Sequence, residues 1–510
     1  MTDGQRRMFY VRERDFLLPQ IPGFLHTWTL HEKEYDRFRA DAYAWPMDFL
    51  GIEIFPDSSF TIQGGPYQFA PVFLVASGDT LYGDWDGTRL YPFLKGVRLN
   101  AGRVLQQLYL NAPYSNQTLF KDMYRLTQQG SATFSREQGL RLDYPEQPAH
   151  VIPRAIRPDA DVTGGLMEVL QHTLLQSISE EHRVRLAVEF SGGVDSSVVI
   201  AVLRQLLPDT PFHGYTLLRS SETDDQTPDR RKALIQHCRL TSHENSTFAQ
   251  TRAFGDAMTE TLNVSAIWPE NLPGFMPYKN AVICPASRDG YTMLFGGLGG
   301  DEACSLSRLE LENQQPADRQ SLSISAFVSR QPGDFPYVSR KAISALSDIG
   351  NETNAAPVLA SPPLFICAEN LNQGLWLCHP LLRNHVLAFM RSLPVEWRIK
   401  KRVLRETLLR LGFSREYAYP ALLPAGQNDM LLEFQQDRPP MVLELFQESR
   451  LADLGYLDRD GLLRDYSALI RGEGSRLGEW AARYYFHVAN LELAIRCVEQ
   501  AVRRPDKIAV

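Results

Sequence analysis

Two glycine-rich stretches of this sequence combine hydroxyl groups and carboxylates at a spacing that suits phosphate chemistry. The first reads SGGVDSS at residues 191–197, and the second reads GGLGGDE at residues 296–302. Glycines let the backbone approach oxygen atoms closely, and hydroxyls and free N–H groups donate hydrogen bonds to them. A carboxylate repels phosphate unless a cation lies between the two, so Asp195 and Asp301 indicate a bridging Mg²⁺. We therefore expect a phosphate site in which both aspartates are metal ligands and catalytic residues.

The first stretch differs from the common nucleotide-binding loop, which needs a lysine before its final Ser or Thr. An ordinary strand-to-helix turn capped by Ser and Asp is the alternative interpretation. The complete string after a buried strand is more specific than a lone Gly-Gly pair, and it favours phosphate binding. The nucleotide-binding residues expected from the two stretches are Ser191, Gly192, Gly193, Val194, Ser196, Ser197, Gly297, Gly299 and Gly300.

Apolar runs that are typical of buried strands precede both stretches. VRLAVEF at residues 184–190 leads into the first and YTMLF into the second, while residues 211–220 predict a further strand and residues 228–240 a helix. Strands that alternate with helices favour a parallel sheet covered on both faces. Ligands of such sheets bind beyond the carboxyl ends of the strands, so we expect the two aspartates to meet there.

Composition excludes several classes of protein. The chain has 510 residues, of which 44% are hydrophobic and 22% charged, and a formal net charge of −7. This charge disfavours a general nucleic-acid binder, which needs a basic face. The six cysteines are scattered without a Cys-x-x-Cys pair, which argues against a zinc site or a disulfide framework. No run approaches the roughly 20 apolar residues of a membrane span. We expect a cytoplasmic protein that binds neither membrane nor nucleic acid.

The fold class predicted for the chain is α/β, in two domains. Residues 1–150 form a β-rich sandwich domain in this interpretation, because short apolar runs alternate there with Gly-Gly, Gly-Pro and Ser-Gly-Asp turns. The proline-containing segment 144–165 is the expected linker. Residues 160–510 form the second domain, with the parallel sheet first and a mainly helical part beyond about residue 362.

SGGVDSS resembles the pyrophosphate loop of the ATP pyrophosphatase superfamily, and together with FGGLGGDEA it resembles the synthetase domain of the asparagine synthetase family. That family's second motif reads Ser-Gly-Glu-Gly-Ser-Asp-Glu. The resemblance implies an N-terminal glutaminase-like domain of the Ntn type and a synthetase domain that uses ATP and Mg²⁺. The implied activity is adenylation of a substrate carboxylate with release of pyrophosphate, after which an amine captures the acyl-adenylate as an amide.

Two departures from the family narrow the function. Its glutaminase domain begins Met-Cys-Gly-Ile, whereas this sequence begins Met-Thr-Asp-Gly, so we expect no glutaminase activity and an amine supplied by the substrate. Relatives of this kind are the lasso peptide cyclases and the β-lactam and carbapenam synthetases. Leu298 stands where the lactam synthetases have Tyr and lasso cyclases commonly have His, so it is expected to line the substrate pocket without acid–base chemistry.

The second departure is the family's late lysine, which neutralises phosphate and which the segment REYAYPALLPAGQNDM lacks. Lys400, Lys401, Arg402 and Arg405 are the candidates to replace it, with Lys401 and Arg405 expected to be catalytic; a solvated helix face is the alternative. Asp224 and Asp225 are expected to recognise the substrate amine or to cap a helix. His379 is expected in the substrate pocket, as a proton acceptor or as a structural histidine.

The leading prediction is a macrolactam synthetase of the lasso peptide type, an AMP-forming carbon–nitrogen ligase of natural-product biosynthesis. Its substrate would carry both the carboxylate and the amine, as a precursor peptide does, and a partner protease would accompany it. A small-ring lactam synthetase is the next interpretation. Two alternatives belong to other functional classes. One is a nucleotide-binding partner protein that has lost catalysis, and the other is an enzyme that modifies RNA.

Overall fold

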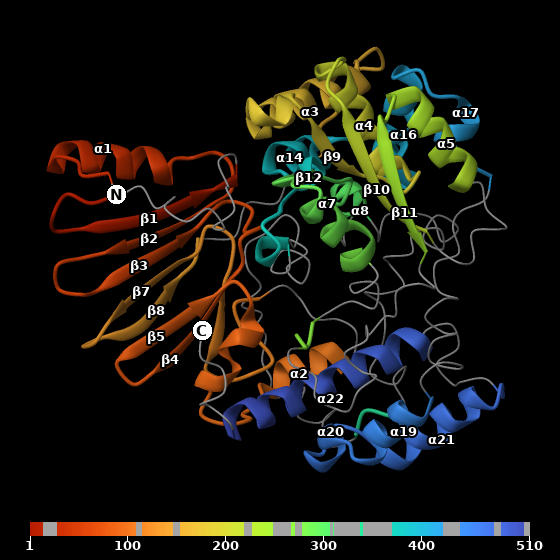
Figure 1. Ribbon diagram of the computed structural model, residues 1–510. Helices are drawn as coiled ribbons and strands as arrows, with labels where there is room; N and C mark the ends of the chain where they lie inside the picture. The colour runs from red at the N-terminus through yellow and green to blue at the C-terminus, as the bar shows by residue number, and fades with distance from the viewer. Residues whose placement is uncertain are drawn as a thin grey trace.

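Figure 1 shows the chain in a computed structural model. It describes residues 1–13, 28–108, 115–145, 153–218, 227–247, 267–270, 278–306, 310, 337–339, 370–421, 439–473 and 481–503.

The N-terminal part contains two antiparallel sheets. The larger has the order β1-β2-β3-β7-β8 and the smaller the order β5-β4-β6. Their bounds are β1 Arg7–Arg12, β2 Phe49–Ile54, β3 Phe60–Gly64, β4 Val72–Ser77, β5 Thr80–Asp84, β6 Met123–Leu126, β7 Ser131–Ser135 and β8 Gly139–Asp143.

These two sheets pack face to face, as the left side of Figure 1 shows. Ile62 and Ala132 of the larger sheet share one apolar cluster with Leu74 and Leu126 of the smaller. Buried and partly buried residues alternate along β2, the period of two that places one face of a strand in the core. Helix α1 (Glu32–Tyr43) covers the outer face of the larger sheet through Tyr35. The prediction of a β-rich sandwich agrees with this layering, while its assignment to the Ntn type stays a prediction.

A second, parallel sheet follows. Its order is β11-β10-β9-β12-β13, and all of its strand pairs are parallel. The strands are β9 Leu186–Glu189, β10 Phe212–Leu218, β11 Ser242–Thr247, β12 Met293–Phe295 and β13 Trp376–Cys378. The expected α/β class with a parallel sheet is therefore confirmed.

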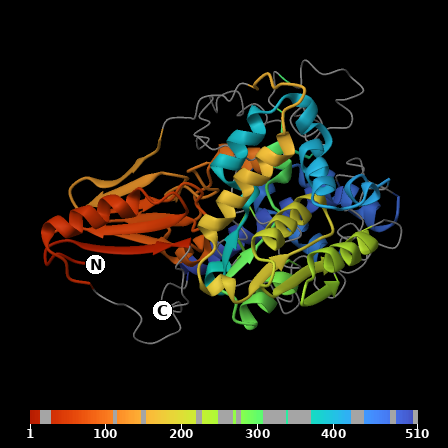
Figure 2. The same ribbon diagram turned by 90° about the horizontal axis from the view of Figure 1, so that it is seen from above.

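Helices cover both faces of the parallel sheet (Figures 1 and 2). One face packs on the apolar sides of α3 Val162–Ser177, α4 Val194–Leu206, α5 Thr227–Cys238, α14 Asn384–Ser392 and α16 Arg402–Arg410. The other face packs on η7 Lys279–Ile283 and α7 Cys284–Arg288, and on Tyr67, Phe69 and Ala70 from the N-terminal part. This second face joins the two parts of the molecule.

The strand order reverses direction at β9, because β10 follows it on one side and β12 lies on the other. In parallel sheets such a switch point opens a crevice at the carboxyl ends of the strands. The two glycine-rich stretches come directly after β9 and β12, the two strands on either side of the switch. The topology therefore places both stretches at the position where such sheets bind ligands.

The C-terminal helices form a third region, blue at the bottom of Figure 1. It contains α19 Pro439–Gln447, α20 Arg450–Asp453, α21 Arg459–Ile470 and α22 Ala481–Arg503. These helices share one core with α2 (Ala101–Leu108), with η2 (Gly87–Phe93) and with Phe73 and Met123 of the smaller antiparallel sheet. The predicted helical C-terminal part is confirmed, and its packing on the first third of the chain is a contact that the sequence did not indicate.

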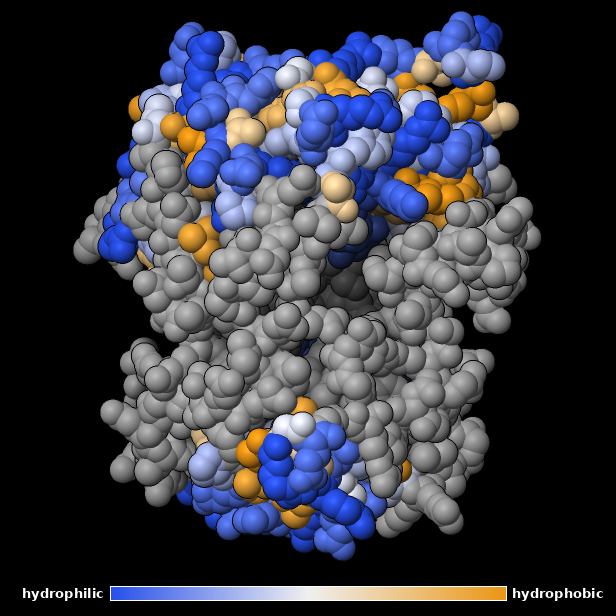
Figure 3. Space-filling model, turned by 90° about the vertical axis from the view of Figure 1, so that its right-hand side faces the viewer, coloured by the Kyte–Doolittle hydropathy of each residue, from blue (hydrophilic) through white to orange (hydrophobic). Residues whose placement is uncertain are grey.

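On the side shown in Figure 3, the described surface is mainly hydrophilic with small hydrophobic areas. Within the described residues, no helix combines the length and apolar character that crossing a membrane requires.

Candidate active site

The first glycine-rich loop connects β9 to the start of α4. Gly193 is the N-cap of α4, and no side chain caps the free N–H groups of the helix's first turn. The loop is held by its own serines: the Gly193 N–H donates to Ser191 Oγ at 3.1 Å, and the Ser191 N–H donates to Ser196 Oγ at 3.4 Å. An uncapped helix N-terminus behind a short polar loop is suited to binding an anion.

Glycines allow the second loop to pack directly on the first. A Cβ on Gly297 would collide with the backbone of Asp195 and Ser196, and a Cβ on Gly300 would collide with the carboxylate of Asp195. Any larger residue at these two positions would therefore push the loops apart. In the described structure, Gly297 and Gly300 are needed because the two loops approach each other closely. The sequence interpretation had assigned these glycines to contact with phosphate.

Lys401 lies between the two aspartates that the motifs contribute. Its Nζ is 2.7 Å from Asp195 Oδ2 and 2.8 Å from Asp301 Oδ1. The Asp195 side chain is 23% exposed and that of Asp301 is 64% exposed, so the pair spans the boundary between the protein interior and solvent. The sequence predicted Mg²⁺ between these carboxylates, and in this structure an ammonium group occupies that place.

An unusual backbone conformation delivers Lys401 to this position. Lys400 and Lys401 have φ values of 53° and 57°, in the left-handed region that residues with a Cβ seldom adopt. Each such residue costs about 1–2 kcal/mol, and it persists only where surrounding contacts enforce it. Arg405 supplies one of them, since its Nε donates to the Lys400 carbonyl at 2.7 Å and its Nη1 to the Ala418 carbonyl at 2.5 Å. Arg405 therefore positions the turn.

The electrostatics keep this cluster charged. Burial by itself lowers the pKa of Lys401, but the charges of Asp195 and Asp301 outweigh it and raise the pKa above its ordinary value. Burial raises the pKa of Asp195, and the charge of Lys401 counteracts part of that rise. Burial also lowers the pKa of Arg405. At neutral pH the ammonium group is therefore fully protonated.

The donor set of this cluster fits a divalent cation. Asp195 Oδ1 is buried and has no hydrogen-bond partner among the described residues, and a buried acceptor without a partner is costly. Mg²⁺ is commonly held by one or two carboxylates while phosphate oxygens and water complete its shell. The described residues contain no group of three or more His, Cys, Asp or Glu side chains that could hold a metal alone. The carboxylates therefore suit a cation that arrives with phosphate.

The other predicted ligand residues have different surroundings. Ser197 is fully buried, and its Oγ is 2.6 Å from both the Gly193 carbonyl and Tyr417 Oη. The Val194 side chain belongs to the apolar core behind the loop. The Ser197 hydroxyl is thus used within the protein and the Val194 side chain lies in the core, so their predicted contact with phosphate, which stays a prediction, would be through backbone N–H groups of the first turn of α4. Leu298 is 39% exposed at the tip of the second loop. Asp224 and Asp225 lie outside the described residues.

His379 follows β13, and it lies beside a residue that the sequence interpretation missed. A Cβ on Gly296 would be 2.8 Å from His379 Nδ1 and 2.7 Å from Glu189 Oε2, so the two side chains converge above that glycine. Tyr278 Oη donates to Glu189 Oε2 at 2.8 Å. A carboxylate at the last position of an apolar strand, two residues before the first motif, was the signal for Glu189 in the sequence.

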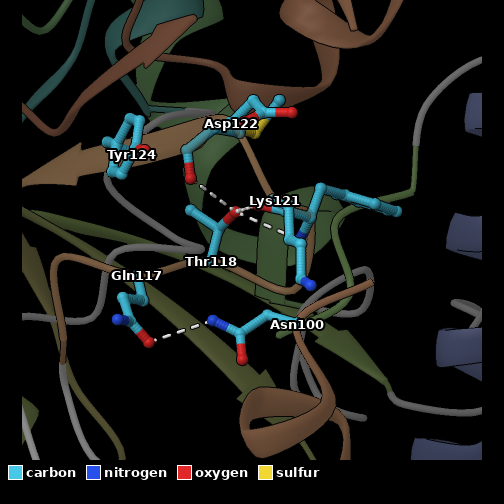
Figure 4. A pocket seen from close by; sticks show the side chains of 8 residues that line it. Asn100, Gln117, Thr118, Lys121, Asp122 and Tyr124 are labelled. Atoms are coloured by element: carbon cyan, nitrogen blue, oxygen red, sulfur yellow. Dashed lines mark hydrogen bonds between the residues drawn. The ribbon is translucent and has the colours of Figure 1, made fainter. Parts of the chain in front are cut away.

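A separate hollow lies in the N-terminal part (Figure 4). It has a volume of about 230 Å³ and is lined by residues between Asn100 and Tyr124, none of which is a predicted site residue. Its polar groups bind one another: Asn100 Nδ2 donates to Gln117 Oε1 at 3.0 Å, and Thr118 Oγ1 donates to the Phe120 and Met123 carbonyls, each at 3.0 Å. None of these hydrogen bonds involves a residue of the two glycine-rich motifs.

Residues 169–326 match the asparagine synthase family. This segment is less than half of the chain, but it contains both glycine-rich motifs and supports an ATP-dependent ligase type of enzyme within the ATP pyrophosphatase superfamily. Lys401 lies beyond its end.

No curated protein matches the chain. Among solved structures, the chain is similar to the U34-tRNA thiolase NcsA from Methanococcus maripaludis, a protein with a 4Fe–4S cluster, at 11% identity over 61% of this chain and 80% of that one. The TM-score is 0.25, which is too low to carry an argument about fold or function.

Proposed function

We propose that this protein is an ATP-dependent ligase that forms an amide bond. It activates a substrate carboxylate as an acyl-adenylate, releases pyrophosphate, and lets an amine displace AMP. The observation that carries the proposal is the convergence of Asp195, Asp301 and Lys401 where the two glycine-rich loops meet. The match of both loops to the asparagine synthase family supports the same chemistry.

In this proposal the β- and γ-phosphates of ATP bind at the start of α4, where no side chain caps the N–H groups of the helix's first turn. Asp195 Oδ1 and Asp301 would hold Mg²⁺, which neutralises the triphosphate and stabilises the departing pyrophosphate. Lys401 would then turn its ammonium group from the carboxylates toward the phosphates, adding positive charge where the leaving group develops negative charge. Arg405 keeps the lysine turn in place.

The carboxylate oxygen of the substrate attacks the α-phosphorus, and the bond from that phosphorus to pyrophosphate breaks. Pyrophosphate leaves with the electron pair. We propose further that the attacking amine belongs to the same substrate molecule, so that the product is a macrolactam of the lasso peptide type, with a precursor peptide as substrate and a protease as partner. A small-ring lactam is the narrower alternative. Leu298, exposed at the tip of the second loop, would contact the acyl group in either case.

A second candidate is a nucleotide-binding protein without catalysis. The observation that favours it is the ammonium group of Lys401, which forms an ion pair with each of the two aspartates. This protein would bind ATP but would release no pyrophosphate.

The screen that tests the proposal uses the whole chain with ATP, Mg²⁺ and hydroxylamine. Peptides with a free N-terminus and one Asp or Glu side chain are added singly, and pyrophosphate, AMP and peptide hydroxamate are measured. We expect at least one peptide to release pyrophosphate and AMP in equal amounts and to give its hydroxamate, because hydroxylamine intercepts an acyl-adenylate. ATP binding without pyrophosphate release from any peptide would favour the second candidate, and formation of ADP and phosphate would contradict both.

A further inference from the structure

Three neighbouring strands bring an acid and a histidine together beside the candidate phosphate site. Val188 of β9 pairs with Phe295 of β12, and Phe295 pairs with Cys378 of β13. The next residue of each strand is therefore at the same level, and these residues are Glu189, Gly296 and His379. Because side chains alternate across a sheet, all three share the face that packs on η7 and α7.

Gly296 leaves the space in which the outer two side chains meet. A Cβ at this position would be 2.7 Å from Glu189 Oε2 and 2.6 Å from His379 Cε1. Contacts this short are unavailable to real side chains, so any other residue would displace the pair. The next residue, Gly297, packs on the Asp195–Ser196 backbone. The glycine above which the acid and the histidine converge therefore directly precedes the glycine at which the two motifs meet.

Contacts from the neighbouring elements fix this carboxylate in place. Tyr278 Oη donates to Glu189 Oε2 at 2.8 Å, and Tyr278 is the residue from which η7, a π-helical turn, begins. Such turns are uncommon and often occur at functional sites. The ring of Phe69, from the N-terminal part, lies 5.8 Å from the His379 ring and helps to bury it.

His379 has unused hydrogen-bonding capacity. His379 is 2% exposed, and among the described residues only a marginal hydrogen bond to the Gly296 backbone reaches its ring, so at least one ring nitrogen is without a partner there. Burial lowers the pKa of His379 to about 4, so the ring is neutral at pH 7 and keeps a free acceptor nitrogen. A buried polar ring with an unused nitrogen costs stability, which is expected where a ligand completes its hydrogen bonds.

We propose that Glu189 and His379 form the subsite that binds the attacking amine and accepts its protons. This inference rests on the proposed ligase function and adds the residues of its second step. A substrate ammonium group suits the pair, because the carboxylate supplies negative charge and the neutral ring supplies an acceptor. A hydroxyl or thiol nucleophile offers only one hydrogen and no positive charge, so it fits the pair less well.

Amide formation from an ammonium group releases two protons, and each of the two side chains accepts one. Glu189 takes one proton from the ammonium group, which frees the nitrogen lone pair. The nitrogen forms a bond to the acyl carbon, and the bond from that carbon to the AMP oxygen breaks with its electron pair on AMP. His379 takes the second proton from the nitrogen as the amide forms. AMP leaves, and both protonated side chains return their protons to solvent between turnovers.

The test separates the two half-reactions in Glu189→Gln and His379→Gln. It uses a peptide that gives a hydroxamate in the screen described above, and it measures ATP–pyrophosphate exchange, hydroxamate formation and conversion of the peptide's own amine to the amide. We expect exchange and hydroxamate formation to stay within a few-fold of the unmodified protein, because hydroxylamine is uncharged at pH 7 and needs no base. Amide formation should fall by about a hundredfold or more, the usual effect of losing general acid–base catalysis.

Asp289→Asn is the matched control. Asp289 accepts a hydrogen bond from Tyr215 Oη at 2.7 Å, a tyrosine–carboxylate pair close in length to that of Glu189, and it lies outside the proposed site. This variant should keep all three activities. His379→Asn, which is smaller, replaces His379→Gln if thermal unfolding shows that the latter does not fold.

Equal losses of exchange, hydroxamate and amide in both site variants would overturn the amine subsite and leave the ligase proposal standing. Amide formation by both site variants at the rate of the unmodified protein would also overturn the amine subsite and leave the ligase proposal standing. If the unmodified protein shows no exchange with any peptide, the ligase proposal fails and the amine subsite fails with it.

Discussion

Two aspartates with buried carboxylate oxygens, one in each half of the molecule, have opposite hydrogen-bonding states. Asp48 precedes β2 and is fully buried. Its two oxygens accept N–H groups of four consecutive residues, 67–70, at 2.6–3.3 Å. Asp195 follows the first glycine-rich loop, shares one oxygen with Lys401, and leaves the other without a partner among the described residues.

Burial and pKa alone do not distinguish these two carboxylates. Burial, with a smaller contribution from the charge of Glu13, raises the pKa of Asp48 to about 6, and burial also raises the pKa of Asp195. Only Asp195 combines an unused acceptor with a cation on a long, rotatable side chain. The comparison of Asp48 with Asp195 shows that a raised carboxylate pKa indicates only burial. An oxygen without a hydrogen-bond partner beside a cation that can move indicates a ligand-binding site. Asp48 organises a loop, and Asp195 is available for chemistry.

The largest effect is expected from Lys401→Ala. This change removes the only ammonium group that contacts both aspartates in the described structure, and with it the charge proposed to stabilise departing pyrophosphate. ATP–pyrophosphate exchange should fall by about a hundredfold or more. The matched control is Lys400→Ala, which removes the same charge from a neighbouring residue with the same left-handed backbone and an exposed side chain. Equal losses in the two variants would mean that general positive charge, and not the cluster, is responsible.

A smaller effect is expected on stability from Asp48. Its pKa is about 6 in the fold against an ordinary value of 3.8, so the folded state binds this proton more tightly than the unfolded state. Protonation therefore favours folding, and the contribution of Asp48 to the free energy of unfolding rises as pH falls from about 6 to about 4. Relative to Asp48→Asn, which does not titrate, the protein should gain about 3 kcal/mol over that interval. Parallel stability curves from denaturant unfolding would contradict this assignment.

The smallest effect is expected from Tyr417→Phe. This change removes the 2.6 Å hydrogen bond between Tyr417 Oη and Ser197 Oγ, while Ser197 keeps its bond to the Gly193 carbonyl. Stability should fall by about 1 kcal/mol, and the exchange rate should change little, because Ser197 supports the loop from behind. A loss of exchange as large as that of Lys401→Ala would instead indicate that the Ser197 hydroxyl itself acts on the phosphates.

Much of the parallel-sheet unit could be predicted from local patterns. The strand expected at residues 211–220 is β10 (Phe212–Leu218), and the helix expected at 228–240 is α5 (Thr227–Cys238). The turns after β9 and β12 were recognisable because glycines, hydroxyls and aspartates follow short apolar runs. Local hydrophobic periodicity and turn residues are sufficient for such elements.

The rest depended on contacts between distant parts of the chain. Lys401 and Asp195 are 206 residues apart, and no local pattern indicates that a Lys-Lys pair adopts a left-handed turn. Glu189 and His379 become neighbours only because β12 lies between β9 and β13. The packing of α22 on α2 likewise requires the tertiary structure. Sequence reasoning found the residues that the loops contribute and missed the partners that strand order and helix packing bring to them.

The most direct test of the central claim compares Asp195→Asn with Asp48→Asn in ATP–pyrophosphate exchange, measured per folded molecule with a peptide that supports exchange. Asp195→Asn keeps the size of the side chain but removes the negative charge that would hold Mg²⁺ and position Lys401, so exchange should fall by about a hundredfold or more. Asp48→Asn should lose stability and keep its exchange rate. Unchanged exchange in Asp195→Asn, or an equal loss in Asp48→Asn, would contradict the assignment of the Asp195–Lys401–Asp301 cluster as the site of adenylation.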